Sequence, residues 1–222
     1  MDVACGTGNC TSAIALARNV QMYGIDSSRR MIEAAKRKSD LVLWEVGDVE
    51  FLPFTDRSFS GVFCTLGIHH FERLQSAVDE TFRVLDHGNF VIFTATPAQM
   101  RRYWLNEYFP VAMTRSMEQM PELQTVIESM ESAGFRVIYT EKFEVEEELQ
   151  DLFLYGGKTR PEIYLNPAVR NGISTFADLA GPEEVRQGCR RLAADIESGH
   201  IKEVISAYQH EEGDYLFVVA EM

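Results

Sequence analysis

The chain alternates between short, nearly continuous apolar runs, which are typical of buried strands, and longer segments with helical periodicity. The apolar runs predict strands that end near residue 3 and at residues 21–25, 41–46, 61–65, 89–94, 136–143 and 215–220. The helical pattern predicts helices up to about residue 19 and at residues 27–38, 73–85, 121–132, 181–199 and 201–208, with Ser27 as the cap of the second. This alternation is that of an α/β fold.

Two closely spaced glycines, Gly6 and Gly8, follow the first apolar run and precede a helical segment. A strand with an acidic residue, Asp2, near its end, then a glycine turn and a helix, lets backbone approach a ligand where a Cβ atom would collide. This geometry favours a nucleotide-like cofactor. The turn by itself fits two classes, dinucleotide oxidoreductases and S-adenosylmethionine methyltransferases.

Two details separate these classes. The dinucleotide fingerprint needs a third small residue, which lets the helix pack closely beneath a pyrophosphate, but Thr11 stands at that position. The Asp2 carboxylate would also repel a pyrophosphate, whereas it suits the positively charged amino group of an amino acid. Both details favour S-adenosylmethionine.

Acidic residues also follow the second and third predicted strands. Asp26 lies about 20 residues after the glycine turn, where a carboxylate accepts hydrogen bonds from both ribose hydroxyls. Taken alone, Asp26 is better explained as a carboxylate that stabilises the start of a helix. Because Asp2 lies upstream, we favour the role of Asp26 as a ribose ligand. Asp48 lies at the edge where open α/β sheets bind ligands, and a plain turn formed by Gly47 and Asp48 is the alternative.

The bulk composition excludes several classes of partner. The chain has 222 residues, which fit one α/β domain with insertions, and its formal charge of −13 opposes binding to nucleic acid. Its four cysteines show no paired spacing, so neither a disulfide framework nor a metal site is indicated. No apolar run reaches the roughly 18 residues that cross a bilayer, and no signal peptide precedes the first motif. We expect a cytoplasmic protein without a membrane partner.

Three stretches carry a resemblance to a known family. The segment Asp2-Val-Ala-Cys-Gly-Thr-Gly8 resembles the first motif of class I S-adenosylmethionine-dependent methyltransferases, in the small-molecule branch (methyltransferase type 11) that includes ubiquinone-biosynthesis-like enzymes. Residues 48–59 and the segment Arg83-Val-Leu-Asp-His-Gly88 resemble later motifs of the same family. The family usually has an aspartate where Ser60 stands, at a position that mostly supports the fold.

The resemblance implies a doubly wound, Rossmann-like sheet of seven strands in the order 3-2-1-4-5-7-6, with the last strand antiparallel. It also implies S-adenosylmethionine as cofactor. Asp26 would then hold the ribose, while Asp48 and the backbone of Val49 would hold the adenine, and Ser27 is a further cofactor-binding candidate. Leu66 would lie on the sulfonium side. The methionine end would be held by the glycine segment, through Asp2, Ala4, Gly6 and Gly8.

The loop after the fourth predicted strand contains two adjacent histidines, His69 and His70. In a doubly wound sheet this loop lies beside the topological switch point, so its side chains reach both cofactor and substrate. A histidine near its ordinary pKa can take the proton from a hydroxyl or amine that attacks a methyl group. Related sequences carry this pair across many substrates, so bracing of the loop is the alternative role.

Residues 97–121 are rich in aromatic residues and methionines. The spacing of Met100, Tyr103 and Trp104 is helical and fits a core face. Family members bind substrate in this region, so a wall for an apolar substrate is the alternative. Tyr155 and Arg160 are further substrate candidates, and Arg160 suits a carboxylate, although pairing with nearby acids is the favoured interpretation.

We expect a single methyltransferase domain, residues 1–222, in which residues 98–133 and 144–212 form helical cap insertions on the substrate side. Family members place several tens of residues before the first motif. An N-terminal helix and part of the first strand are therefore expected to be missing. A second copy of the chain, in a homodimer, is a candidate to fill that gap.

The predicted function is transfer of a methyl group from S-adenosylmethionine to an oxygen, nitrogen or carbon nucleophile of a small molecule. Such in-line transfer depends on alignment and exclusion of water more than on covalent catalysis. An S-adenosylmethionine-binding or partner-binding protein without turnover is the second hypothesis. An NAD-dependent oxidoreductase is the third, and the missing third glycine opposes it.

Overall fold

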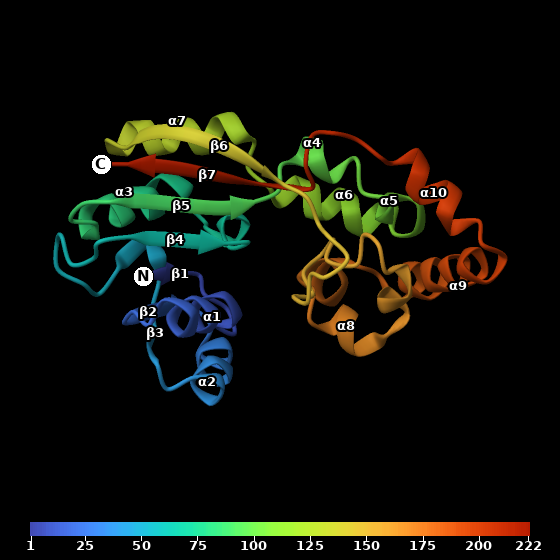
Figure 1. Cartoon of the computed structure of the whole chain (residues 1–222), viewed down its shortest axis with the longest axis horizontal. Helices are drawn as coiled ribbons and strands as arrows, with labels where there is room; N and C mark the ends of the chain where they lie inside the picture. Colours follow the sequence, from blue (N-terminus) through green and yellow to red (C-terminus); the bar gives the residue numbers. More distant parts are fainter. The chain divides into compact units, whose positions relative to one another are not determined.

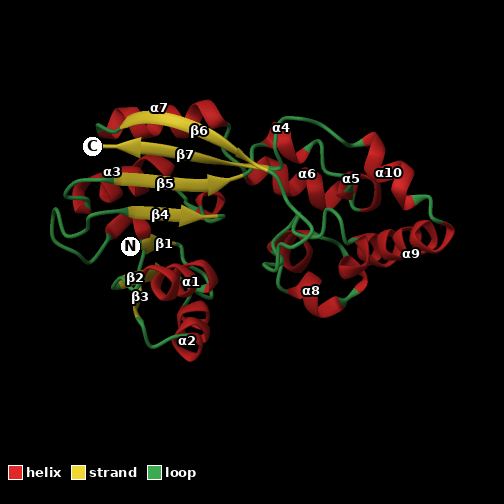
Figure 2. Ribbon diagram, in the orientation of Figure 1, coloured by secondary structure: helices red, strands yellow, loops and turns green.

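The computed structural model describes all 222 residues, which divide into two compact units. The first unit comprises Met1–Thr94, Pro121–Glu141 and Leu216–Met222, and the second comprises Ala95–Met120 and Lys142–Tyr215. Figure 1 follows the chain through both units. Figure 2 shows that the sheet belongs mainly to the first unit, while helices and loops make up most of the second. No helix is both long and apolar enough to span a bilayer.

The first unit is built on a seven-stranded sheet in the order β3-β2-β1-β4-β5-β7-β6, which confirms the predicted order. The first five strands are parallel, and the last strand pairs antiparallel with β5, also as predicted. The strands are β1 (Asp2–Val3), β2 (Met22–Asp26), β3 (Val42–Val46), β4 (Val62–Thr65), β5 (Asn89–Thr94), β6 (Arg136–Phe143) and β7 (Tyr215–Glu221).

Helices cover both faces of this sheet. The crossover from β1 leads toward one side of the sheet and the crossover from β4 toward the other. Because such crossovers are right-handed, their helices lie on opposite faces. Figure 1 shows α3 and α7 on the same face. The helices of this unit are α1 (Asn9–Arg18), α2 (Arg29–Lys38), α3 (Leu74–Val84) and α7 (Leu123–Ala133), with 3₁₀ turns at Val49–Phe51 and Ile68–His70. Residues 121–133 therefore belong to the sheet unit, because α7 packs against α3, and not to the expected cap.

Two hydrophobic cores lie against the sheet. The larger includes Leu85, Phe90 and Ile92 and extends to α3 and α7. The smaller lies under α1 and α2 and includes Ile32 and Trp44. Burial on both faces explains why the central strands read as continuous apolar runs.

One predicted cap is displaced by one residue. The hydroxyl that caps α2 is that of Ser28, which accepts a hydrogen bond from the Met31 backbone N–H at 3.4 Å, and not that of Ser27. The Ser27 side chain is left at the edge of the sheet, because the Asp26 carboxylate turns the chain by accepting from the Ser28 N–H at 2.8 Å. In the same unit Gly134, with φ of 108°, ends α7.

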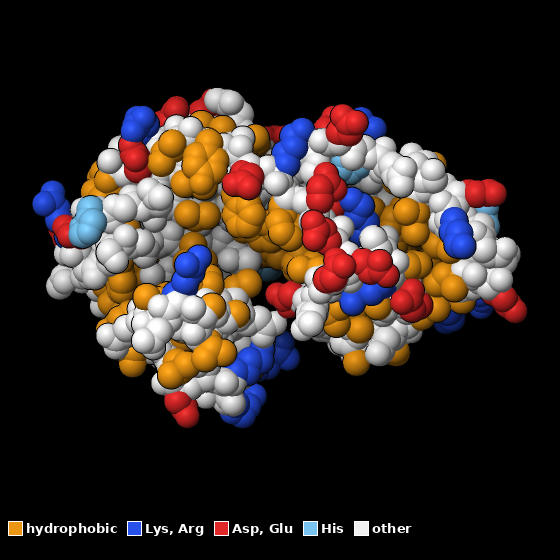
Figure 3. All heavy atoms as spheres, viewed as in Figure 1, with side chains coloured by type: hydrophobic (Ala, Val, Ile, Leu, Met, Phe, Trp, Pro, Cys, Tyr) orange, Lys and Arg blue, Asp and Glu red, His pale blue; other side chains and the backbone are white.

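The second unit is helical and has an aromatic core, in which Tyr103, Trp104, Tyr155 and Tyr164 are almost fully buried. Four of its helices begin with proline, which suits the first helical turn because its missing N–H would have no partner there. In Figure 3, acidic and basic side chains are interspersed over the visible face of this unit. The helices are α4 (Pro97–Met100), α5 (Leu105–Tyr108), α6 (Pro110–Gln119), α8 (Pro167–Asn171), α9 (Pro182–Ser198) and α10 (Ile201–Ala207).

Shortening a side chain in the larger core should destabilise the first unit. Ile92 is fully buried on β5, between β4 and β7, so Ile92→Ala is expected to lower the free energy of unfolding by about 2–5 kcal/mol in urea titrations. Leu41→Ala, at a side chain that is 58% exposed, is the control and should change it by less than about 0.5 kcal/mol. Equal effects at the two positions would contradict this assignment of the core.

Candidate functional site

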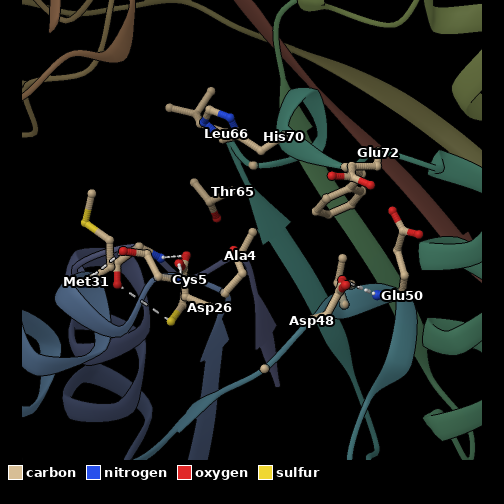
Figure 4. A pocket seen from close by; sticks show the side chains of 17 residues that line it. Ala4, Cys5, Asp26, Met31, Asp48, Glu50, Thr65, Leu66, His70 and Glu72 are labelled. Atoms are coloured by element: carbon tan, nitrogen blue, oxygen red, sulfur yellow. Dashed lines mark hydrogen bonds between the residues drawn. The ribbon is translucent and has the colours of Figure 1, made fainter. Parts of the chain in front are cut away.

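A cavity of about 610 Å³ lies at the carboxyl ends of β1, β2, β3 and β4 (Figure 4). Its volume is in the range of pockets that hold small ligands and cofactors. All of it is formed by the first unit. The lining consists of residues 4–6, 26–28, 47–50, 65–67 and 70–72, together with Met31.

The turn after β1 follows a left-handed backbone path, with φ of 56° at Ala4, 54° at Gly6 and 72° at Gly8. The Gly8 N–H donates to the Cys5 carbonyl at 2.9 Å, which closes the turn at the start of α1. Of these three residues only Ala4 has a Cβ atom, and the left-handed conformation costs such a residue about 1–2 kcal/mol. Backbone strain of this kind is characteristic of functional sites.

The Asp26 carboxylate joins the ends of β1 and β2. Its Oδ2 accepts from the Gly6 N–H and its Oδ1 from the Ser28 N–H, each at 2.8 Å. The side chain lies on the cavity wall, and each oxygen keeps a lone pair for a further donor. The predicted ribose ligand is therefore also the link that sets the position of the glycine turn.

Asp48 and Val49 follow β3 and line the cavity, as predicted for an adenine site. The Asp48 Oδ1 accepts from the Glu50 N–H at 2.9 Å and so caps the short 3₁₀ turn. The buried Glu50 carboxylate also lines the cavity and accepts from the Arg73 backbone N–H and from Arg73 Nε, both at 2.7 Å. Sequence reasoning missed Glu50, since a single glutamate after a strand looks like a surface residue.

The two later sequence motifs contact each other beside this wall. The Arg83 guanidinium donates to the carbonyls of Leu52 and Phe54 at 3.0 and 2.8 Å and to the Asp56 carboxylate at 2.8 Å. It also pairs with the Glu80 carboxylate at 2.7 Å. The segment from Leu52 to Asp56 is thereby held against α3, so this segment and the Arg83 motif support the wall without lining the cavity.

Leu66 follows β4 and is the second non-glycine cavity residue in the left-handed region, with φ of 53°. Its N–H donates to the Phe93 carbonyl at 2.8 Å. The next residue, Gly67, approaches the turn after β1 so closely that an added Cβ would lie 2.7 Å from the Ala4 Cβ. Ala4 and Leu66 thus line the cavity from two strand ends that pack directly together.

Asp2 and Gly8 do not line the cavity, although both were predicted to contact the cofactor. The Asp2 side chain is 1% exposed, and its Oδ2 accepts from the Thr11 hydroxyl at 2.5 Å, while Oδ1 has no hydrogen-bond partner. Burial raises the pKa of Asp2 to about 7, and the Thr11 hydrogen bond opposes this rise. The geometry therefore assigns Asp2 to the support of α1 beneath the turn.

The structure separates the two histidines. His70 is exposed and lines the cavity, where Figure 4 shows it beside Leu66. His69 lies behind it, with ring centroids 4.0 Å apart, and its Nδ1 is buried without a hydrogen-bond partner. Burial and then the neighbouring His70 lower the pKa of His69 to about 4. Only His70 is therefore placed to exchange a proton with a ligand in the cavity.

The four predicted substrate residues belong to the second unit, and most of their polar groups have partners within it, whereas Arg160 Nε is buried without a hydrogen-bond partner. Tyr103 and Trp104 are fully buried, and Tyr155 stacks on Tyr103 with centroids 3.9 Å apart. The Tyr103 hydroxyl donates to the Asp214 carbonyl, and the Arg160 guanidinium donates to two backbone carbonyls. This burial favours the core interpretation over an aromatic substrate wall. The Arg160 guanidinium donates to backbone carbonyls and forms no ion pair with the nearby acids that were expected to bind it.

The charge of the cavity is negative. Four carboxylates line it, those of Asp26, Asp48, Glu50 and Glu72, and no lysine or arginine does. Such a lining attracts a cation and repels phosphate groups. No group of three histidine, cysteine or acidic side chains is placed to hold a metal ion.

Comparison with known proteins agrees with this arrangement. A family described as a methyltransferase domain matches residues 1–93. The curated demethylmenaquinone methyltransferase of Chlorobaculum tepidum is 28% identical over 156 residues, which are 61% of this chain and 64% of that protein. The chain thus spans slightly less than two thirds of that relative. The comparisons give no support to the homodimer that was a candidate to fill the gap before the first motif.

Two solved structures extend the comparison to the whole chain. A crystal structure from Anabaena variabilis, provisionally named as a methyltransferase from an antibiotic biosynthesis pathway, is 32% identical and has a TM-score of 0.88. The match covers 100% of this chain and 89% of that one. The crystal structure of the cyclase SpnF has a TM-score of 0.60 at 19% identity, covering 99% of this chain and 72% of that one. At this identity the likeness concerns the fold alone.

The low pKa of His69 predicts a pH dependence of stability. Since the unfolded state binds this proton more tightly, with an ordinary pKa of 6.5 against about 4, stability is lost as the pH falls through that window. Between pH 7 and pH 5 the wild type should lose about 1–2 kcal/mol more than His69→Gln in urea titrations. His87→Gln, at an exposed histidine, is the control and should behave as the wild type. Equal losses in wild type and His69→Gln would refute this role of burial.

Proposed function

The chain belongs to the class I S-adenosylmethionine-dependent methyltransferases, and we propose on this premise that it transfers the methyl group of S-adenosylmethionine to a small molecule. One observation carries the proposal: Asp26, Asp48 and the glycine turn meet around one cavity at the strand ends. These three features come from separate loops, and together they match the ribose, adenine and methionine portions of the cofactor.

The residues around the cavity fit this cofactor. The Asp26 oxygens already accept backbone N–H groups, which orient the carboxylate, and their remaining lone pairs suit two ribose hydroxyls. The space beside Gly6 is open, since a Cβ atom added there would meet no heavy atom within 4 Å. A cavity lined by four carboxylates and no basic residue also suits a sulfonium better than a pyrophosphate, which opposes the NAD alternative.

When bound, S-adenosylmethionine supplies a methyl group on a positively charged sulfur, which leaves as a neutral thioether when an acceptor lone pair takes the methyl group. The residues of this chain bind and orient the cofactor. Asp26 would fix the ribose, and Asp48 with the Val49 N–H would fix the adenine. Ala4, Gly6 and Leu66 would lie along the methionine and sulfonium side, and Asp2 would act indirectly by holding α1 through Thr11.

We assign to His70 the role of the base that takes the proton from the acceptor. Its side chain lies on the cavity wall and is exposed, whereas the His69 ring is held neutral behind it. A base is needed when the nucleophile is a hydroxyl, an amine or the carbon of a quinol. The relative from Chlorobaculum tepidum is named for demethylmenaquinone, so reduced naphthoquinones are the first acceptors to test.

Binding of S-adenosylmethionine without methyl transfer is the second candidate function. It is favoured by one observation, that none of the four residues predicted to bind an acceptor lines the cavity. The two candidates share the cavity and differ in turnover alone. Retained binding with no S-adenosylhomocysteine formed on reduced naphthoquinones, catechols or amines would favour the second.

Removing the Asp26 carboxylate should disable the cofactor site. Calorimetric titration with S-adenosylmethionine and S-adenosylhomocysteine should show binding to the wild type, and Asp26→Ala should weaken it by at least about tenfold through lost charge-assisted hydrogen bonds. Asp40→Ala removes an exposed carboxylate from the same unit and should leave the affinity unchanged. Circular dichroism at the titration temperature shows whether each variant is folded. Absence of binding to the folded wild type would contradict the proposed function.

Removing the His70 imidazole should slow the chemical step and spare cofactor binding. With an acceptor that carries a proton, His70→Ala is expected to lower kcat by about 10²–10⁴-fold, the usual contribution of a general base. The affinity for S-adenosylmethionine should stay within about twofold of wild type, a small free-energy difference. Added imidazole should restore part of the rate, because the site is exposed. An unchanged kcat would remove His70 from the mechanism.

A further inference from the structure

The indole of Trp44 fills the space directly beneath the glycine turn. A Cβ atom added to Gly8 would lie 2.2 Å from this ring, and one added to Gly24 of β2 would lie 2.4 Å from it. Trp44 comes from β3, is 8% exposed, and belongs to the smaller core under α1 and α2. Its Nε1 donates to the Ser39 carbonyl at 3.0 Å, which holds the ring in this orientation. Gly8 is therefore required both by its left-handed backbone and by the ring below it.

A second group holds the same turn from the solvent side. The Lys38 ammonium, at the end of α2, donates to the Thr7 hydroxyl at 2.7 Å and to the Asn9 side-chain oxygen at 2.5 Å. Thr7 and Asn9 flank Gly8, so the turn is held between Lys38 outside and Trp44 inside. Contacts of an exposed lysine contribute little, whereas a buried tryptophan contributes much more through packing. Trp44 is thus the dominant of the two.

We propose that Trp44 is a positioning residue that holds the glycine turn in its ligand-ready conformation and thereby sets the affinity for the cofactor. As far as the ligand is S-adenosylmethionine, this inference rests on the proposed function. Trp44 does not line the cavity and acts through Gly8, beneath which its ring lies. Nothing in the glycine motif, residues 2–8, indicates that a tryptophan is needed at position 44 on β3.

The physical argument starts from the strain in the turn. Ala4, Gly6 and Gly8 all have positive φ, and the turn keeps this path through few hydrogen bonds, chiefly Gly6 N–H to Asp26 and Gly8 N–H to the Cys5 carbonyl. Without the indole a void would open beneath Gly8, and the strained turn would be free to relax into it. The Gly6 N–H would then lose its alignment with the Asp26 carboxylate. Both the backbone path of the ligand-binding turn and the orientation of the Asp26 carboxylate depend on that hydrogen bond.

Amide hydrogen exchange and calorimetry on the full chain test this proposal. In unliganded Trp44→Leu, the Gly6 and Gly8 amides should exchange at least about tenfold faster than in wild type, as expected when local opening costs about 1.4 kcal/mol less. The dissociation constant for S-adenosylmethionine should rise by a similar factor. Trp44→Phe keeps a ring beneath Gly8 and should give a smaller change in both quantities.

The matched controls are Val42→Ala and Ile32→Ala, which shorten buried side chains of the same core that do not meet the glycines. They should lower the unfolding temperature and leave both the turn amides and the affinity unchanged. Unchanged exchange of the Gly6 and Gly8 amides in Trp44→Leu would overturn the proposal. Equal changes in the controls would also overturn it, because general destabilisation would then be the cause.

The two measurements separate this inference from the proposed function. If folded wild type fails to bind S-adenosylmethionine, the proposed function fails, and the exchange of the turn amides still decides whether Trp44 holds the turn. If wild type binds and Trp44→Leu binds equally well, the positioning role is refuted while the proposed function stands. Should Trp44→Leu fail to fold, the same comparison is made with Trp44→Phe, for which no change in exchange is the contradicting result.

Discussion

The hydrogen bonds of the Asp26 carboxylate are the constraint on which the site depends. One oxygen accepts the Gly6 N–H from the turn after β1, and the other accepts the Ser28 N–H at the start of α2. A single side chain therefore joins two neighbouring strand ends and orients itself in doing so. Because charge-assisted hydrogen bonds are about twice as strong as neutral ones, this link contributes strongly to holding the strained turn.

The sheet turns this local link into a cavity. Parallel strands bring their carboxyl ends to one edge of the sheet. From β1 the chain adds strands toward one side of the sheet and from β4 toward the other, which leaves a crevice between the ends of these two strands. Four segments that are distant in the sequence thus line the cavity, and three of them contribute its four carboxylates, while none contributes a basic side chain. The negative lining favours a cationic cofactor, whereas the fold alone is compatible with many functions.

Close packing at this edge explains the strained residues. Ala4 and Leu66 both adopt the left-handed conformation without being glycine, and Gly67 leaves room for the Ala4 methyl group. Trp44 fills the opposite side of the turn, under Gly8. The turn is consequently defined by surrounding side chains as much as by its own glycines, and this is why strain there persists.

The sequence by itself determined the α/β class and the strand-end carboxylates Asp26 and Asp48, because periodicity and turn residues are local properties. The strand order followed from the resemblance of its motifs to a known family. Tertiary structure alone decided that Asp2 supports α1 beneath the turn, that Ser28 caps α2, and that His70 faces the cavity while His69 lies half-buried behind it. It also revealed Glu50 and Trp44, and it placed Tyr103 and Trp104 in a core. Each of these depends on which residues from distant segments become neighbours, and one sequence read locally carries no information about such neighbours.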